Sequence, residues 1–102
     1  MSIKRIQILS NAEDDLCEGR KFYDKQGGNI GDYFWDSLLS DMESLVIFAG
    51  IHRREFGFYR MLSKRFPYAI YYDVNGDVVS VVAVLPIRRD PMWVKAKMGV
   101  RS

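Results

Sequence analysis

The residues of this chain best suited to chemistry are cations at the ends of apolar, strand-like runs in the stretch 55–91. They are Arg60, Lys64, Arg65, Arg88 and Arg89. Guanidinium groups stay charged and match the geometry of phosphates and carboxylates, so cations held on a rigid sheet would suit a polyanion or an acidic peptide. The alternative interpretation is that they are rim charges that keep the sheet edges soluble.

RNA cleavage would be the most demanding chemistry for such a site, because it needs a base and an acid besides a cation on the phosphate. Arg60 and Arg88 are the candidates for holding the phosphate. His52 is the only residue with a reference pKa near neutrality, and we expect it in an exposed loop before a strand. Lys64 could act only if its surroundings favoured the neutral amine. Trp93 could stack on a base but cannot carry a proton.

Composition indicates one globular domain over residues 1–102, with 48% hydrophobic and 14% aromatic residues. The net charge of +2 does not demand a nucleic-acid partner. Acidic residues crowd 13–43, whereas 52–65 and 86–101 are mostly basic. We therefore expect an acidic helical half and a basic sheet half, a separation of charge that can steer an anionic partner.

Several classes of protein are disfavoured by what the sequence lacks. Cys17 is the only cysteine and His52 the only histidine, which excludes an internal disulfide and argues against a zinc site. We expect no metal and no cofactor. No run approaches the ~20 apolar residues of a membrane span. The opening residues do not form a signal-peptide pattern, so we expect a cytoplasmic protein.

The first half of the sequence predicts a strand followed by two helices. Residues 3–9 read as a strand, and Ser10 with Glu13 three residues later predicts a capping box at the start of a helix. Gly27-Gly28 would end that helix. A second helix is predicted from residue 30 to residue 48, and the short link makes the pair an antiparallel hairpin.

The second half predicts three antiparallel strands in a meander. They cover residues 53–65, with a bend at Gly57, then 68–74 and 77–85. Asn75-Gly76 predicts a type I′ turn between the last two. The run VVSVVAVL is apolar on both faces and predicts a strand covered on both sides. Residues 88–98 would form a turn and a short basic helix, partly covering the second face of the sheet. The fold class is α+β, with all strands in one sheet.

Two other groups of residues have a structural interpretation. We expect most aromatic residues of the strand region to pack the helices onto the sheet rather than to form a stacking platform for nucleic acid. We expect the carboxylates Glu13, Asp14, Asp15 and Glu18 to be a solvated helix start.

Taken in order, short patterns along nearly the whole chain resemble the RelE/ParE superfamily of bacterial toxins. They are Ala12, Asp15 and Leu16; Phe22-Tyr23; Gly31 and Phe34; Tyr59, Arg60 and Leu62; Arg65–Tyr68; Ile70–Tyr72; and Ala83–Leu85 followed by Arg88–Pro91. The resemblance implies a toxin of a type II toxin–antitoxin system, of the plasmid-stabilisation kind, that is silenced by an antitoxin lying across it.

The resemblance leaves the target open. RelE-like members cut messenger RNA on the ribosome, whereas ParE-like members poison DNA gyrase and lack nuclease residues. Arg60 and Arg88 match positions where RelE-like toxins carry functional arginines. Such toxins also tend to place a Tyr or His just beyond the last-strand arginine, and here neither follows Arg88. Pro86 stands near where many relatives carry a His.

These departures favour a ParE-like toxin that arrests growth by binding a protein such as DNA gyrase. The alternatives are a ribosome-dependent endoribonuclease, and a decayed or domesticated member that binds only its antitoxin. Whether the chain is an enzyme stays open at this stage. The residues expected to contact an antitoxin or target are Arg60, Lys64, Arg65, Arg88, Arg89 and Trp93.

Overall fold

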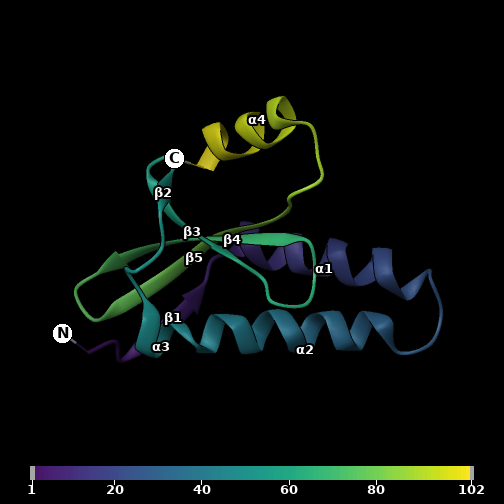
Figure 1. Ribbon diagram of the computed structural model, residues 1–102, viewed down its shortest axis with the longest axis horizontal. Helices are drawn as coiled ribbons and strands as arrows, with labels where there is room; N and C mark the ends of the chain where they lie inside the picture. Colours follow the sequence, from purple (N-terminus) through teal and green to yellow (C-terminus); the bar gives the residue numbers. More distant parts are fainter. Residues whose placement is uncertain (1, 102) are drawn as a thin grey trace.

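A computed structural model describes residues 2–101. Its five-stranded sheet has the order β1-β5-β4-β3-β2 (Figure 1). The strands are β1 (Arg5–Ile8), β2 (Arg54–Glu55), β3 (Phe58–Leu62), β4 (Tyr68–Asn75) and β5 (Val78–Pro86). The helices are α1 (Ser10–Asp24), α2 (Ile30–Glu43), α3 (Leu45–Phe48) and α4 (Pro91–Arg101). The predicted α+β class, helical hairpin and meander of β3, β4 and β5 are confirmed.

Helices cover both faces of the sheet. The hairpin of α1 and α2 packs on one face, and α4 lies across the other (Figure 1). β1 runs parallel to β5, whereas the remaining neighbours are antiparallel. Strand β5 therefore lies between β1 and β4 with a helix on each side, which explains why its sequence is apolar on both faces.

Two hydrophobic clusters correspond to the two faces. The larger joins α1 and α2 to the sheet through buried residues such as Leu16, Phe34, Leu38 and Tyr72. The smaller joins Met98 of α4 to the opposite face, and its other buried members are Ala69, Tyr71, Val82, Ala83 and Leu85. Val82 and Ala83 share this face because the register of β4 and β5 shifts between Tyr71 and Tyr72.

The capping box predicted at Ser10 is wrong. Helix α1 begins one residue earlier than expected, with extended Leu9 at the N-cap position and no side-chain cap. The Leu9 amide donates to the Val81 carbonyl at 3.0 Å, so the last pairing with β5 leads directly into the helix. An N-cap residue has extended backbone. Ser10 is already the first helical residue, so it cannot act as the cap.

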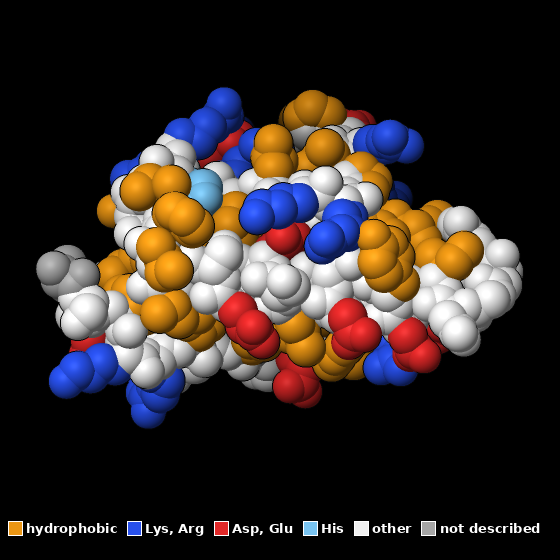
Figure 2. Space-filling model, turned by 60° about the horizontal axis from the view of Figure 1, so that its bottom comes forward, with side chains coloured by type: hydrophobic (Ala, Val, Ile, Leu, Met, Phe, Trp, Pro, Cys, Tyr) orange, Lys and Arg blue, Asp and Glu red, His pale blue; other side chains and the backbone are white. Residues whose placement is uncertain are grey.

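The second predicted helix is interrupted. α2 ends at Glu43, and Ser44 separates it from the short α3. The Ser44 hydroxyl donates to the Asp41 carbonyl at 2.6 Å, a local bond that competes with the continuing helix. Beyond the break, Val46, Ile47 and Phe48 are exposed, and Figure 2 shows hydrophobic side chains gathered beside the single histidine.

The prediction of one continuous strand over residues 53–65 is wrong. The segment forms a hairpin of β2 and β3, in which Glu55 pairs with Phe58 across a two-residue turn. Phe56 and Gly57 both have positive φ, at 57° and 85°, as a type I′ turn requires. A phenylalanine is an unusual residue for this conformation, and the local sequence gave no sign of it.

The hairpin predicted at Asn75-Gly76 exists, but its turn is shifted by one residue. Asn75 belongs to β4 and pairs with Val78, so Gly76 and Asp77 form the loop. Positive φ occurs at Gly76, at 63°, and at neither Asn75 nor Asp77, which corresponds to type II′ rather than type I′.

Candidate functional site

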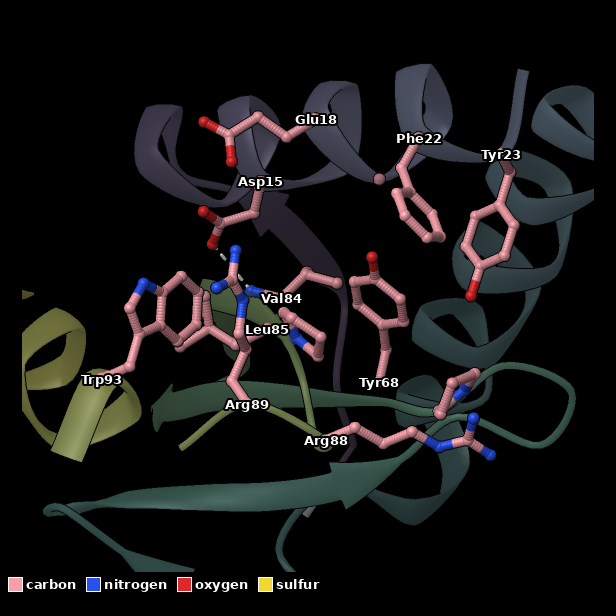
Figure 3. A pocket seen from close by; sticks show the side chains of 13 residues that line it. Asp15, Glu18, Phe22, Tyr23, Tyr68, Val84, Leu85, Arg88, Arg89 and Trp93 are labelled. Carbon is pink, nitrogen blue, oxygen red and sulfur yellow. Dashed lines mark hydrogen bonds between the residues drawn. The ribbon is translucent and has the colours of Figure 1, made fainter. Parts of the chain in front are cut away.

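A hollow lies where β4 begins and β5 ends, between α1 and the start of α4 (Figure 3). This groove has a volume of about 480 Å³ and opens to solvent. It is lined by Asp15, Glu18, Gly19, Phe22, Tyr23, Pro67, Tyr68, Val84, Leu85, Pro86, Arg88, Arg89 and Trp93. Three of the six residues predicted to contact a partner, Arg88, Arg89 and Trp93, are thus brought together.

The cations of the groove follow directly from the end of β5. Arg88 and Arg89 are exposed and extend in different directions along it (Figure 3). Neither makes an ion pair with residues 2–101. The Arg89 guanidinium lies 4.6 Å from the centre of the Trp93 ring, a cation–π contact that ties the loop after β5 to α4.

Two tyrosines give the groove its floor. Tyr68, at the first position of β4, is 7% exposed, and Tyr23 extends from the last turns of α1. Both rings pack around Phe34, with centroid distances of 4.9 Å for Tyr68 and 5.1 Å for Tyr23. Burial raises the pKa of Tyr68 to about 12 and also raises the pKa of Tyr23. Both hydroxyls therefore stay protonated near neutral pH and can donate hydrogen bonds.

Gly19 allows α1 to come this close to α2. A Cβ on Gly19 would lie 2.4 Å from the Phe34 ring, so the glycine is required by the approach of the two helices. The same contact fixes Phe34 behind Tyr23 and Tyr68. The floor of the groove is therefore set by packing in the helical hairpin.

Asp15 corrects the expectation of a solvated helix start. It is buried and pairs with Arg101 through both carboxylate oxygens, with one contact at 2.9 Å. It also accepts the Val84 amide at 2.9 Å, and Arg101 donates to the Val82 carbonyl at 3.3 Å. Because β1 pairs with β5 only as far as Val81, this ion pair satisfies the strand edge that β1 leaves open.

Arg60 lies apart from the groove, on the α4 face of the sheet opposite Tyr71. Its Nε atom lies 3.5 Å from a carboxylate oxygen of Glu55 and donates to the Tyr71 hydroxyl at 3.3 Å. The same Glu55 oxygen accepts from Arg53 at 2.9 Å. The turn at Phe56-Gly57 brings Glu55 over Arg60, so this arginine has a carboxylate partner that it shares with Arg53.

Lys64 and Arg65 lie in the loop between β3 and β4, outside the groove lining. Both are exposed. The loop is anchored by buried Asp41 of α2, which accepts the Ser63 hydroxyl at 2.6 Å and the Lys64 amide at 3.3 Å. The backbone of Lys64 is thus fixed, while its side chain is directed to solvent.

His52 is not in a freely exposed loop, as the sequence led us to expect. It is half-buried, and its Nδ1 atom lies 2.6 Å from the Tyr72 hydroxyl, which also accepts the Gly50 amide at 2.9 Å. Burial lowers the pKa of His52. A neutral imidazole that accepts the tyrosine proton fits these contacts. His52 therefore holds the segment after α3 against β4.

Sequence reasoning missed the residues that complete both sites. Tyr68 belongs to the strand-region aromatics that we expect to pack, and Tyr23 lies on the first helix. Both do pack, yet their hydroxyls reach the groove. Glu55 and Tyr71 were not connected with Arg60. The alternation along β3 and β4 could have found Tyr71, because directly opposed residues share a face.

Within residues 2–101, no group of three or more His, Cys, Asp or Glu residues is arranged to hold a metal ion. In the same part of the chain, none of the helices has the length and apolar character that crossing a bilayer would require.

No protein-family model matches the chain, and no curated protein matches it. Its fold is similar to that of a solved structure described as the chromosomal ParDE TA system from P. aeruginosa, with a TM-score of 0.75. The two share 13% sequence identity over 84% of this chain and 98% of that chain. The likeness expected from the sequence is thereby confirmed for the fold.

Proposed function

We propose that the chain is the toxin of a type II toxin–antitoxin system, of the ParE-like kind, which arrests growth by binding a protein target such as DNA gyrase. The likeness in fold to a chain of a ParDE system supports this proposal. A cognate antitoxin, encoded by an adjacent gene, would hold the protein inactive in the cytoplasm. The protein would need no metal and no cofactor for this role.

The observation that carries the proposal is the contrast between the arginines. Arg88 and Arg89 make no ion pair with residues 2–101 and border an open, aromatic groove. Arg60 is paired with Glu55. Unpaired guanidinium groups beside exposed rings are typical of surfaces that bind proteins. An RNA-cleaving centre would also need a base close to these arginines. The pKa values of Tyr23 and Tyr68 are raised, and of the two carboxylates in the lining Asp15 is paired with Arg101, which leaves Glu18.

The antitoxin should place acidic or amide side chains against Arg65 or Arg88, rather than against Arg60, which already pairs with Glu55. The complex should bury a standard interface of about 1,600 Å² in total. Native co-purification of this chain with the product of the neighbouring gene tests the partnership. We expect a stable complex, and the absence of a complex at about micromolar concentrations would overturn the proposal.

Growth of bacteria expressing the chain tests toxicity. Induction alone should slow growth, and co-expression of the partner should restore it. Normal growth with soluble protein present would instead support the decayed or domesticated alternative, in which the chain binds an antitoxin and little else.

One observation favours the second candidate function, a ribosome-dependent endoribonuclease. Glu55, Arg60 and Tyr71 combine a carboxylate, a guanidinium and a phenol on one face of the sheet, and these are groups able to serve as base, phosphate ligand and acid. The ion pairs of Glu55 with Arg53 and Arg60 argue against this role in the free protein, since they engage the carboxylate that would act as the base.

A further inference from the structure

The groove contains hydrogen-bond donors without partners. Among residues 2–101, neither the Tyr23 hydroxyl nor the Tyr68 hydroxyl makes a hydrogen bond. The two rings lie 6.4 Å apart between centroids, and both contribute to the groove lining (Figure 3). Two phenols that remain protonated and face a common space form a site for an acceptor group.

Arginines accompany both hydroxyls. Arg88 lies close enough to Tyr23 to lower its pKa partly, against the larger effect of burial, and Arg89 acts on Tyr68 in the same way. An acceptor bound here would therefore be an anion, because a guanidinium strengthens hydrogen bonds to charged oxygens.

The charge balance favours an anion with a single charge. Asp15 is neutralised by Arg101, and the remaining charged residues of the lining are Arg88, Arg89 and Glu18. Together they leave about one net positive charge. The carboxylates of Glu18 and Asp15 act on Tyr68, so a dianionic phosphate would meet repulsion that a carboxylate would feel less.

The groove also has an apolar wall. Phe22 is 55% exposed although it borders a cavity, and Trp93 faces it from α4 (Figure 3). Further apolar residues of the lining are Pro67, Pro86, Val84 and Leu85. A volume of about 480 Å³ accepts one or two bulky side chains, and burial of Phe22 would add hydrophobic stabilisation.

We propose that the groove binds a peptide segment in which a carboxylate lies next to a bulky apolar side chain. The carboxylate accepts hydrogen bonds from Tyr23 and Tyr68 and pairs with Arg88, while the apolar side chain packs against Phe22 and Trp93. This inference rests on the proposed function and deepens it, because it gives the chemistry of the partner segment that this surface recognises.

Small probes test the groove without any partner. The first probe, N-acetylphenylalanine, carries a carboxylate beside a benzyl group. The second probe is the corresponding C-terminal amide, which lacks the negative charge. The third, adenosine 5′-monophosphate, offers a phosphate with an aromatic base. We expect N-acetylphenylalanine to shift the Trp93 indole NMR signal saturably, with a dissociation constant of about 1 mM, as befits so small a ligand. The amide should bind about tenfold more weakly or worse.

Variants assign the interaction to named residues. Tyr68→Phe and Arg88→Gln should each weaken binding of N-acetylphenylalanine about tenfold, the usual effect of losing one hydrogen bond to a charged group. Arg5→Gln removes an exposed cation of β1 outside the groove and should leave binding unchanged. Amide proton spectra of all variants show whether each is folded.

Three results would overturn the inference: no binding of N-acetylphenylalanine at about 10 mM, equal binding of the amide, or tighter binding of the nucleotide. Tighter binding of the nucleotide would indicate a phosphate site.

Failure of the proposed function would give a different result. If the probe binds but no complex forms with the neighbouring gene product, the groove chemistry stands and the toxin–antitoxin proposal falls. A complex whose affinity is unchanged by Tyr68→Phe and Arg88→Gln would leave the toxin–antitoxin proposal standing and overturn the groove as its recognition site.

Discussion

The groove at the end of β5 and the cluster around Arg60 use arginine in opposite ways. In the cluster, Glu55 and Tyr71 hold the guanidinium in place, and Glu55 pairs with it as well as with Arg53. In the groove, Arg88 has no carboxylate partner among the described residues, and Tyr23 and Tyr68 beside it have unused hydroxyls. A cation that the fold has already paired contributes mainly to stability, whereas an unpaired one is available to a partner.

Both situations occur within the groove lining, because Asp15 is paired with Arg101 whereas Arg88 has no ion-pair partner among the described residues. Without Arg101, the wall formed by α1 would present Asp15 as a further negative charge next to Arg89. With Arg101, α4 is fastened to the open edge of β5, and the acidity of α1 reaches the groove mainly through Glu18. The first prediction concerns this pair because its disruption should have the largest effect.

Asp15→Ala should lower the free energy of unfolding by about 3–5 kcal/mol, because it leaves the largely covered Arg101 without its counter-charge and the Val84 amide without an acceptor. Urea denaturation measures the loss. Asp14→Ala removes the neighbouring exposed carboxylate and should change stability by less than about 0.5 kcal/mol. Equal effects of the two variants would show that the ion pair does not fasten α4.

Arg88→Gln and Arg60→Gln test the comparison directly. Arg88→Gln should weaken the antitoxin complex by about 2 kcal/mol or more, roughly thirtyfold, with little change in stability. Arg60→Gln should lower the free energy of unfolding by about 1 kcal/mol, through loss of the Glu55 and Tyr71 contacts, and leave affinity nearly unchanged. Isothermal titration and urea denaturation provide the two readouts. The opposite pattern would reverse the roles of the two arginines.

The sequence predicts those parts of the fold that depend on residues close together in the chain. Hydrophobic periodicity predicted the helical hairpin, the meander and the two-sided burial of β5, because each pattern is contained in one element. The interruption between Glu43 and Leu45 is confined to Ser44, whose backbone stays in the helical region, and periodicity does not report so short a break.

The sites were harder to predict because they depend on distant partners. Asp15 and Arg101 are separated by 86 positions, and nothing near Asp15 reveals that it will be buried. Glu55 approaches Arg60 only because Phe56 adopts positive φ, a conformation that its residue type disfavours. The sequence indicates the arginines of the groove, whereas the pattern around Tyr68 indicates a packing residue and nothing in it marks Tyr23 as a hydrogen-bond donor of the same site.

Titration of His52 should make the free energy of unfolding depend on pH, with a smaller effect than the substitutions above. Burial lowers its pKa in the folded protein, so the unfolded chain binds a proton more readily. The free energy of unfolding should therefore fall as the pH falls below about 6.5, the unfolded pKa, until the lowered folded pKa is passed. His52→Gln keeps a hydrogen-bond acceptor for Tyr72 but does not titrate. Denaturation at about pH 7.5 and about pH 5.5 should show a weaker pH dependence in this variant, and an unchanged dependence would contradict the argument.

The smallest expected effect is on messenger RNA. We expect no substantial ribosome-dependent cleavage, since neither Tyr nor His follows Arg88 in the sequence and His52 is held against Tyr72 rather than in the groove. Loss of an acid–base group reduces rates by about 100–10,000-fold, so phosphate-binding arginines alone would cut slowly. Growth arrest should instead come with DNA-damage signalling, if gyrase is the target, and with intact message. Primer extension on ribosome-bound message after brief induction measures cleavage directly.

Strong codon-phased cuts that disappear in Arg60→Ala and in Glu55→Gln would show that the Arg60 cluster is an active centre, with Glu55 and Tyr71 as its proton-transfer groups. Intact message, with arrest lost in Arg88→Ala and kept in Arg60→Ala, would instead assign growth arrest to binding at the groove.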